Sequence, residues 1–505
     1  MTIEIKDGVQ ATLSTILEGE NPSSYRDAPI SLCGVDANER LSGGLFICKE
    51  TKSEAAIAAV EQAAGNGARH AVLSRSVEEE TKGKLPETLE TIYVDDPRST
   101  YARACQAFRG FPGRKLRLIG ITGTAGKTSL SYVLGGVLAE AGMKIGLVGS
   151  LGVYDGLKLS PSLKTTPEPD RLAQLLDEMV SSGCCGAIVE ASSVALAEKR
   201  LAGLEFDAVC LTNIRRDHLD YHGTVDAYRR AKMLIFNYLK PEGIAICNVD
   251  DRVTDAALHL ITQPVLTVGV QPTQCSVSGT PVERYKGEQT FYIVAGSDAV
   301  PIRTKVIGKE HIYNCLEATA LAIAWKIDLK TVARGIERVE YIPGRMERID
   351  CGQPFGVYLD RASTPHALTA ALETLRSVTS GAIYCILCAP GDKDRSKRQL
   401  MAVAAESNAD VRVVTSGNLP ESQSEEALND LRRGFSSRDA FRDEPDRRKA
   451  IVWALTQAGL EDAVLVVGQD VSTLASINEL FVPDRQFIRN WLYDNQPSAE
   501  SYWYN

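Results

Sequence analysis

The 505-residue chain lacks the features that mark membrane, secreted and nucleic-acid-binding proteins. No uncharged apolar run approaches the ~20 residues that a bilayer-spanning helix needs. The first ten residues, MTIEIKDGVQ, do not show the basic and then apolar pattern of a secretory signal peptide. The formal net charge of -9 argues against a nucleic acid held through phosphate contacts. We therefore expect a cytoplasmic protein whose partners are neither nucleic acids nor membranes.

The twelve cysteines show no pattern typical of a metal site or a disulfide framework. The Cys-x-x-Cys segment at 385–388 lies inside an apolar run and has no second pair. Cys184 and Cys185 are adjacent, which is a poor geometry for a shared metal ion. Scattered cysteines in apolar runs are typical of core thiols in a reducing compartment.

Apolar, β-branched runs recur along the chain, and each is followed by a glycine-rich or polar turn and then a helical stretch. The runs lie at 116–121, 187–189, 208–212, 244–247, 382–387, 411–415 and 464–467. Strands buried on both faces read as continuous apolar runs, and alternation of strands with helices builds parallel sheets. The sequence therefore predicts an α/β protein.

The length indicates about three domains. Pro-Gly segments at 111–114 and 341–344 each precede a new series of strands and helices. We therefore predict domains at 1–112, 113–344 and 345–505.

The most specific motif is a glycine-rich loop, ITGTAGKT at 121–128, which follows a predicted strand and precedes a predicted helix at 129–141. Glycines let the backbone N–H groups point inward, and the helix start adds its positive end. Lys127 would reach the β- and γ-phosphates of ATP, and the Thr128 hydroxyl would ligate Mg²⁺. Ile121 stands where the strict P-loop pattern has its first glycine, so the motif is a variant P-loop.

Two further segments follow predicted strands. Glu190 ends the strand at 186–189, at the edge of an open α/β sheet where ligands bind. The segment RDHLDYHG at 216–223 holds two of the six histidines. It is compatible with a His near a second Mg²⁺ and equally with a surface helix capped by Asp217. Lys232 lies further on, and its spacing alone predicts a lysine on a helix surface.

Together these segments resemble the Mur ligases of peptidoglycan synthesis, and most closely the UDP-N-acetylmuramoyl-tripeptide synthetases among them. The similar stretches are GITGTAGKTS (120–129), TTPE (165–168), VEASS (189–193), TNIRRDHLDYHG (212–223) with AK at 231–232, NVDD (248–251), IYN (312–314) and GRMER (344–348). They cover the predicted middle domain in family order. The resemblance implies a three-domain architecture with a substrate domain, a central P-loop parallel-sheet ATPase domain and a Rossmann-like C-terminal domain.

The resemblance also implies roles for the matched residues. The catalytic residues would be Lys127, Glu190, His218 and Lys232. The ligands of Mg²⁺ would be Thr128, Glu190, His218 and Lys232, the last as a carbamate formed with CO₂. ATP would be contacted by Gly123, Thr124, Gly126, Lys127, Thr128, Asn314, Arg345 and Asp360. The acceptor substrate would be contacted by Thr165, Thr166, Ser192 and Arg200.

The activity that the resemblance implies is ATP-dependent ligation of an acid to an amine. A substrate carboxylate would attack the γ-phosphate while lysine and Mg²⁺ neutralise the developing charge. The amine of an amino acid would then attack the acyl phosphate. The implied partners are small molecules, UDP-MurNAc-L-Ala-D-Glu or a related acid and an amino acid, and we expect a monomer.

The sequence departs from the family pattern in the outer domains. The nucleotide-contacting D-S-R reads Asp36-Ala37-Asn38, and the glycine-rich segment expected near 50–54 is missing. The family's D-Y-A-H-T-P-D reads DRASTPH at 360–366, and its G-D-R-D-x-G-K-R reads GDKDRSKR at 391–398. The diaminopimelate-selecting D-N-P-R reads GNLP at 417–420, and G-K-G-H-E reads GQDVS at 468–472. Neither lysine nor proline reproduces a bidentate arginine clamp, so these changes argue against diaminopimelate as the amine.

Two other functions are compatible with parts of the sequence. An ATP-binding regulator or scaffold related to a ligase would bind ATP without coupling an acid to an amine. A P-loop NTPase that uses ATP for conformational work would need no modified Lys232, and it would leave the segment at 217–223 unexplained.

Overall fold

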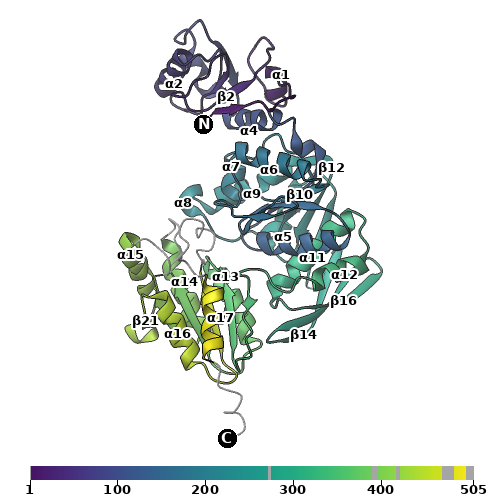
Figure 1. Cartoon of the computed structure of the whole chain (residues 1–505), viewed down its shortest axis with the longest axis vertical. Helices are drawn as coiled ribbons and strands as arrows, with labels where there is room; N and C mark the ends of the chain where they lie inside the picture. Colours follow the sequence, from purple (N-terminus) through teal and green to yellow (C-terminus); the bar gives the residue numbers. More distant parts are fainter. Residues whose placement is uncertain (1, 271–274, 389–394, 417–420, 469–482, 496–505) are drawn as a thin grey trace. The chain divides into compact units, whose positions relative to one another are not determined.

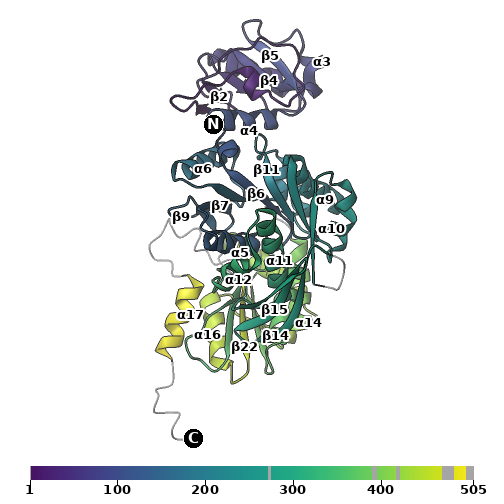
Figure 2. The same ribbon diagram turned by 90° about the vertical axis from the view of Figure 1, so that its right-hand side faces the viewer.

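The computed structural model describes residues 2–270, 275–388, 395–416, 421–468 and 483–495 (Figures 1 and 2). Three β-sheets are present, and each lies within one of the three ranges that the sequence predicts as domains. By internal contacts the chain forms two compact units. The first unit comprises Met1–Thr122, Met143–Val209 and Arg230–Ala245, and the second comprises Gly123–Gly142, Cys210–Arg229 and Ile246–Asn505.

The N-terminal sheet has five strands in the order β1-β2-β3-β4-β5: β1 (Thr2–Glu4), β2 (Leu32–Gly34), β3 (Leu45–Ile47), β4 (His70–Ser74) and β5 (Glu90–Val94). Only β1 runs antiparallel to its neighbour. Alternate residues of each strand face different helices. Leu45 and Ile47 share a core with α4 (Pro97–Ala107), whereas Phe46 and Cys48 share one with α2 (Ser53–Gly65). Burial on both faces explains why these strands are short apolar runs.

The central sheet has eleven strands in the order β16-β15-β14-β13-β12-β11-β6-β10-β7-β8-β9. Its middle contains β6 (Arg117–Thr122), β7 (Ile145–Gly149), β10 (Gly186–Glu190), β11 (Phe206–Leu211), β12 (Leu239–Asn248) and β13 (Val265–Gly269). Strand β10 pairs in parallel with both β6 and β7, as the apolar runs predict. Antiparallel strands lie at both edges: β8 (Gly152–Tyr154) and β9 (Leu159–Ser160) at one, and β14 (Val277–Tyr285), β15 (Glu288–Ala295) and β16 (Asp298–Thr304) at the other.

The C-terminal sheet has the order β17-β18-β22-β19-β20-β21. Its strands are β17 (Glu347–Arg348), β18 (Gly356–Asp360), β19 (Ile383–Cys388), β20 (Val411–Thr415), β21 (Arg442–Asp443) and β22 (Ala463–Val467), and all but β17 are parallel. Helices α13 (Pro365–Arg376), α14 (Ser396–Asn408) and α15 (Glu421–Arg432) share one core with the sheet. Helices α16 (Arg447–Gln457) and α17 (Asp484–Asp494) share the other. Helices on both faces of a parallel sheet make this the doubly wound arrangement predicted for the C-terminal region.

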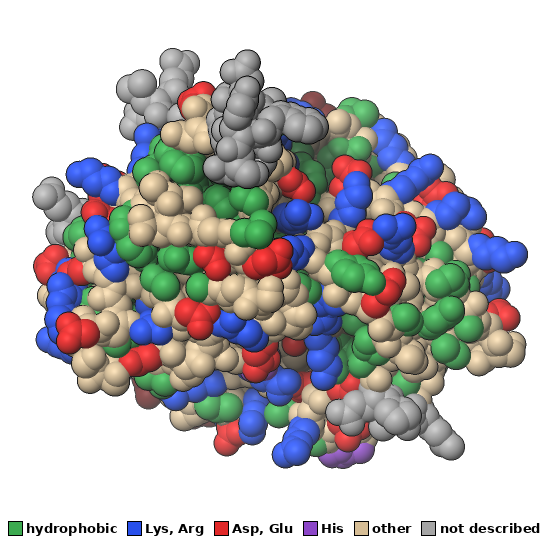
Figure 3. Space-filling model, turned by 90° about the horizontal axis from the view of Figure 1, so that it is seen from below, with side chains coloured by type: hydrophobic (Ala, Val, Ile, Leu, Met, Phe, Trp, Pro, Cys, Tyr) green, Lys and Arg blue, Asp and Glu red, His purple; other side chains and the backbone are tan. Residues whose placement is uncertain are grey.

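Within the described residues, no helix has the length and apolar character needed to cross a membrane. The face shown in Figure 3 carries lysine and arginine side chains interspersed with aspartate and glutamate.

Candidate active site

The glycine-rich loop connects β6 to α5 (Lys127–Glu140), as the sequence predicts. A side chain at Gly123 would overlap the hydroxyl of Thr212. Gly126 has a φ of 91°, and a Cβ there would lie 2.9 Å from the side-chain oxygen of Asn314. Both positions therefore need glycine, because neighbouring side chains lie directly against the loop backbone. The second contact also places Asn314, the predicted adenine-binding residue, beside the phosphate loop.

Two residues after β11 hold this loop in shape. The Thr212 hydroxyl donates a 2.6 Å hydrogen bond to the Ala125 carbonyl. The Asn213 side chain accepts from the Ala125 N–H at 3.0 Å, and the Asn213 carbonyl accepts from the Thr124 N–H at 2.9 Å. These residues belong to the TNIRRDHLDYHG stretch, but this role was not predictable from the sequence because their partners lie 87 and 88 residues away.

The predicted phosphate ligands lie at the start of α5. The Lys127 ammonium donates to the carbonyl of Gly123 at 2.6 Å, so the side chain folds back over the loop. Thr128 is buried in the first helical turn. Loop carbonyls that hold Lys127 in place leave its charge at the loop, where phosphates of ATP would bind.

A polar cluster adjoins Asn314 on α11 (Lys309–Ala324). Tyr313 donates a 2.7 Å hydrogen bond to the Asp250 carboxylate, which also accepts from the Val270 N–H at 2.7 Å. Burial, together with the hydrogen bond to Asp250, raises the pKa of Tyr313, so its phenol stays protonated. The cluster offers a hydroxyl and carboxylate next to the predicted adenine contact.

In the first unit, Glu190 lies at the carboxyl end of β10, where its register partner is Ile121 of β6. Its side chain is fully buried and accepts a 3.3 Å hydrogen bond from the Ser150 hydroxyl. A Cβ at Gly149 would overlap the Glu190 carboxylate, so the neighbouring strand leaves room for the acid only because position 149 is glycine. The structure thus places Glu190 at the carboxyl end of a parallel strand, as the sequence predicts, while its role as a ligand of Mg²⁺ stays a prediction.

Three of the four predicted acceptor-binding residues of the same unit, Thr166, Ser192 and Arg200, form one hydrogen-bonded network. Thr166 is buried and donates to the Glu190 carbonyl at 2.7 Å, and it accepts from the Ser192 N–H at 3.0 Å. The Arg200 guanidinium donates to the Thr166 carbonyl at 2.9 Å and pairs with Glu198 and Glu168. Thr165 is half-buried next to them. Arg200 thus already has protein carboxylates as partners, and its substrate role would add to this structural one.

His218 lies in the second unit, at a left-handed turn with a φ of 49° before the short helix α8 (Leu219–His222). Its N–H donates to the Asp217 carboxylate at 2.9 Å, and its ring lies 6.4 Å from the Tyr228 ring. Tyr228 is buried and hydrogen-bonds Thr124 at 2.9 Å, which connects this segment to the glycine-rich loop. Asp217 is buried as well, rather than capping a surface helix. Burial raises the pKa of Asp217, but the charges of His218 and Lys397 together lower it overall.

Arg345 and Asp360, the two predicted ATP contacts from the last third of the chain, lie close together. Asp360 ends β18 and accepts a 2.8 Å hydrogen bond from the Met346 N–H. Burial raises the pKa of Asp360, and the positive charge of Arg345 partly opposes this effect. The structure thus brings these two residues together at one sheet edge.

Lys232, in α9 (Val225–Met233), is only 1% exposed, so the surface position predicted from spacing is wrong. Tyr228, one turn earlier in the same helix, and Ala231 are buried as well, so this face of the helix points into the protein. Lys232 therefore lies inside the protein, away from bulk water.

The residues present fit Mg²⁺. In the described part of the chain, no three His, Cys, Asp or Glu side chains gather closely enough to hold a metal ion by themselves. Mg²⁺ is usually bound through one or two carboxylates, substrate phosphates and water, not by an all-protein cage. Glu190, a buried carboxylate, and Thr128, a buried hydroxyl after the loop lysine, are donors of that kind.

Three segments in which the sequence departs from the family lie wholly or largely outside the described residues. They are 391–394, 417–420 and 469–472. Of the last family motif only Gly468 is described, and it is followed directly by this gap.

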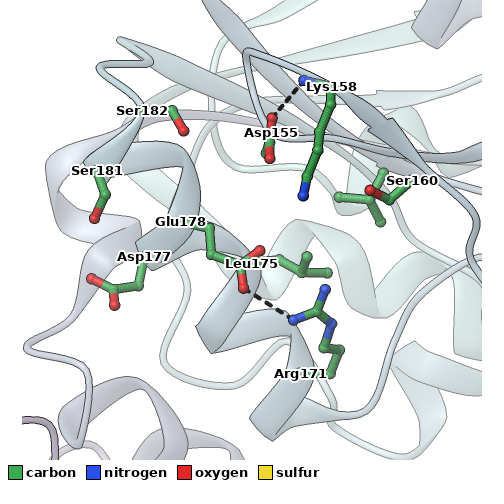
Figure 4. Close-up of a pocket in the computed structure, with 10 residues that line it drawn as sticks. Asp155, Lys158, Ser160, Arg171, Leu175, Asp177, Glu178, Ser181 and Ser182 are labelled. Atoms are coloured by element: carbon green, nitrogen blue, oxygen red, sulfur yellow. Dashed lines mark hydrogen bonds and ion pairs between the residues drawn. The ribbon is translucent and has the colours of Figure 1, made fainter.

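A cavity of about 410 Å³ lies elsewhere in the first unit, between the β8–β9 hairpin and α6 (Pro169–Ser181) (Figure 4). None of the predicted site residues lines it. Its acids already have protein partners: Asp177 pairs with Lys6, Glu178 with Arg171, and Asp155 accepts backbone N–H groups of the hairpin. The cavity is therefore separate from the residues assembled above.

The chain is similar to known proteins over most of its length. Residues 121–322 match the family model of the Mur ligase middle domain, and residues 344–469 match that of the Mur ligase, glutamate ligase domain. The UDP-N-acetylmuramoyl-L-alanyl-D-glutamate–2,6-diaminopimelate ligase of Geobacillus thermodenitrificans is 35% identical over 453 residues, which cover 88% of this chain and 91% of that protein. The ligase of the same name from Bacillus cereus is 32% identical and covers 92% of each chain.

Solved structures show the same fold. A ligase with that same name matches with a TM-score of 0.64 at 25% identity, over 91% of this chain and 94% of that one. The MurF ligase of Thermotoga maritima, in complex with ADP, matches with a TM-score of 0.61 at 15% identity, over 92% and 98%. The chain therefore has the three-domain α/β fold of the Mur ligases, and it belongs to this family as an ATP-dependent carbon–nitrogen ligase.

Proposed function

We propose that this ligase adds an amino acid to UDP-N-acetylmuramoyl-L-alanyl-D-glutamate during peptidoglycan synthesis. The observation that carries the proposal is the similarity, over about nine-tenths of both chains, to ligases named for that acceptor. The intact network around Thr166 supports it, because this network stands where the resemblance expects the acceptor. The reaction consumes ATP, and the twelve cysteines are free thiols. Both properties are expected of an enzyme that acts in the cytoplasm.

We assign domain roles that follow from this activity. Residues 1–112 would bind the nucleotide end of the acceptor, residues 113–344 ATP, and residues 345–505 the amino acid. Support comes from the three sheets, which fall one in each range, and from the P-loop in the second. The sequence at 36–38 departs from the family in the first range, so the contacts to the nucleotide would differ in detail.

Each group of site residues has its own role in the proposed reaction. Lys127 and the loop N–H groups around Gly123, Thr124 and Gly126 would bind and orient the phosphates of ATP, while Thr128 and Glu190 would each supply an oxygen donor to Mg²⁺. The ion would neutralise charge on the phosphates when bound. The acceptor carboxylate, oriented by the Thr166 and Ser192 network, attacks the γ-phosphate and displaces ADP. The amine of the amino acid then attacks the acyl phosphate, which releases phosphate and forms the amide.

His218 and a carbamate on Lys232 complete the proposed metal ligands. Formation of the carbamate joins the lysine nitrogen to CO₂ with loss of one proton, and it converts a base into an anionic oxygen donor. The burial of Lys232 supports the assignment. Asn314, with Arg345 and Asp360, would contact the adenosine part of ATP.

The amine is the part of the reaction in which this chain differs most from its relatives. Where the resemblance expects the arginine of D-N-P-R, the sequence reads GNLP at 417–420. Without that guanidinium, the second carboxylate of diaminopimelate would lack its bidentate partner. We therefore propose that the amine is an amino acid other than diaminopimelate.

The test is phosphate release from ATP with Mg²⁺, bicarbonate, UDP-MurNAc-L-Ala-D-Glu and a panel of amino acids that includes diaminopimelate and lysine. We expect release to require the acceptor and one amino acid, and the Lys127→Ala variant to lose it. Release with diaminopimelate alone would overturn the amine assignment. Silence across the panel with ATP binding intact would instead favour an ATP-binding relative that performs no coupling.

A further inference from the structure

The segment that carries His218 is joined to the start of α14 by a buried ion pair. The Lys397 ammonium donates a 2.8 Å hydrogen bond to the Asp217 carboxylate, 180 residues earlier in the chain. Both residues lie in the second unit, and their side chains are only 6% and 9% exposed. The preceding residues also meet, because Arg216 donates to the Ser396 hydroxyl at 3.4 Å. Two successive residues of one segment therefore contact two successive residues of the other.

Asp217 connects this ion pair to His218. The carboxylate oxygen that accepts from Lys397 also accepts the His218 N–H at 2.9 Å, and the other oxygen lies 3.6 Å from the imidazole. His218 adopts a left-handed backbone conformation that a non-glycine residue rarely takes. The Asp217 carboxylate therefore contacts both the backbone and the ring of the histidine.

Residues on either side of Lys397 are held by ion pairs within the C-terminal region. Asp430 on α15 pairs with Arg395 at 2.9 Å and with Arg398 at 3.0 Å, one on each side of the lysine in sequence. These pairs anchor the first turn of α14. A buried carboxylate such as Asp217 is stable only beside a partner cation, so an anchored lysine determines where this carboxylate can lie.

We infer that Lys397 is a positioning residue for His218: through Asp217, it holds the histidine in the geometry that binds the divalent ion. The inference rests on the proposed function, because it takes His218 as a metal ligand. It adds a residue of the C-terminal third of the chain to the determinants of metal affinity. The divalent ion would then bind with full affinity only while Lys397, at the start of α14, contacts Asp217.

The test uses Mn²⁺ as the probe for the Mg²⁺ site, with free Mn²⁺ measured by electron paramagnetic resonance in the presence of ADP. Partners that orient a metal ligand typically contribute 10–100-fold to metal affinity. We expect Lys397→Met to raise the Kd for Mn²⁺ by roughly that factor and to leave ADP binding without metal unchanged. The half-activating Mg²⁺ concentration for phosphate release should rise in parallel, with less change in kcat at saturating Mg²⁺.

The matched control is Arg398→Met. It removes an adjacent, equally buried cation whose ion pair with Asp430 stays inside the C-terminal region. Because Arg395 still pairs with Asp430, α14 stays anchored, and we expect a lower melting temperature with a much smaller change in the Kd for Mn²⁺ than Lys397→Met gives. Lys397→Arg, which keeps a cation, should recover part of the affinity lost in Lys397→Met.

A double-mutant cycle separates positioning from general stability. Asp217→Asn should weaken Mn²⁺ binding alone, and Lys397→Met should add nothing in that background. A folded Lys397→Met variant with wild-type Mn²⁺ affinity would overturn the inference. Additive effects of the two substitutions on Mn²⁺ affinity would also overturn it. If Lys397→Met does not fold, wild-type Mn²⁺ affinity in a folded Asp217→Asn variant would overturn it. Wild-type protein that binds Mn²⁺ but releases no phosphate with any acceptor would contradict the proposed function. The double-mutant cycle on Mn²⁺ affinity would still decide whether the inference holds.

Discussion

The hydroxyl of Thr212 occupies the space that a side chain at Gly123 would need, and it donates a hydrogen bond to the Ala125 carbonyl of the same loop. The loop is thus shaped by a residue at the end of the neighbouring strand β11. Its conformation is set before ATP arrives, which lowers the ordering cost of binding.

We predict that Thr212→Val weakens ATP binding by about two- to tenfold, the worth of one neutral hydrogen bond. Thr212→Ser keeps the hydroxyl and should bind almost as wild type. Gly123→Ala should be more damaging than either, because its Cβ meets the hydroxyl directly. The measurement is the Kd of ATP by calorimetry. Equal affinity for Thr212→Val and wild type would show that the hydroxyl does not shape the loop.

We predict that Lys232→Ala loses at least ~10²-fold in turnover, a magnitude usual for loss of one group that stabilises transition-state charge. Short carboxylic acids such as acetate or propionate should restore part of this activity, because they can place a carboxylate where the carbamate would stand. Wild-type turnover should also fall when bicarbonate and CO₂ are removed. Lys240→Ala, which removes a partly exposed lysine paired with Asp207, is the control. Wild-type turnover in Lys232→Ala would rule out the carbamate.

The buried His311 should make the protein sensitive to acid. Burial lowers the pKa of His311 to about 4, whereas an exposed imidazole in the unfolded chain titrates near 6.5. The native state therefore holds the neutral ring, and its contribution is complete above pH ~6.5 and is lost as pH falls towards the native pKa. The loss amounts to about 3 kcal/mol for a shift of this size.

Glutamine at position 311 can still hydrogen-bond Thr304 but cannot titrate. We predict a shallower fall in unfolding free energy between pH 7 and pH 4.5 for His311→Gln than for wild type, measured by urea denaturation. Identical slopes for the two proteins would show that the ring is not buried in its neutral form.

Glu317 on α11 should have the opposite effect. Its side chain is buried, and one carboxylate oxygen has no hydrogen-bond partner among the described residues. Burial, with a smaller effect of Glu310, raises the pKa of Glu317 well above its usual value. The native state then holds a proton that the unfolded state releases near pH 4.3, so this residue makes folding less favourable as pH rises.

The Glu317→Gln variant should therefore gain stability relative to wild type as pH increases from 5 to 8. Urea denaturation at several pH values measures this difference. A pH-independent difference between the two proteins would mean that Glu317 is ionised in the native state and paired.

The parts of the site that are local in sequence were predictable, and the parts that depend on distant residues were not. The loop at 121–128 and the position of Glu190 followed from spacing, because a glycine-rich turn after a strand and an acid at a strand end act through their own backbone. The burial of Lys232 was missed, since two charged arginines at 229 and 230 lie in the same helical turn. The partner of Asp217 is Lys397, and no pattern within one segment indicates a contact across 180 residues.

The same distinction applies to the fold. Continuous apolar runs predicted the parallel strands of the central and C-terminal sheets. The antiparallel strands β14–β16 were not predicted, because polar residues such as Glu283, Glu288 and Arg303 interrupt their apolar positions. These strands extend the central sheet at one edge, where polar side chains can remain in water.

The most direct test of the account follows the oxygen atoms of the acceptor. The acceptor is prepared with ¹⁸O in the carboxylate that is to be coupled, and the phosphate released with ATP and the accepted amino acid is analysed by mass spectrometry. Attack of the carboxylate on the γ-phosphate leaves one substrate oxygen on phosphorus, so we predict one ¹⁸O in each phosphate. Phosphate free of ¹⁸O, released at the rate of amide formation, would contradict the acyl-phosphate mechanism.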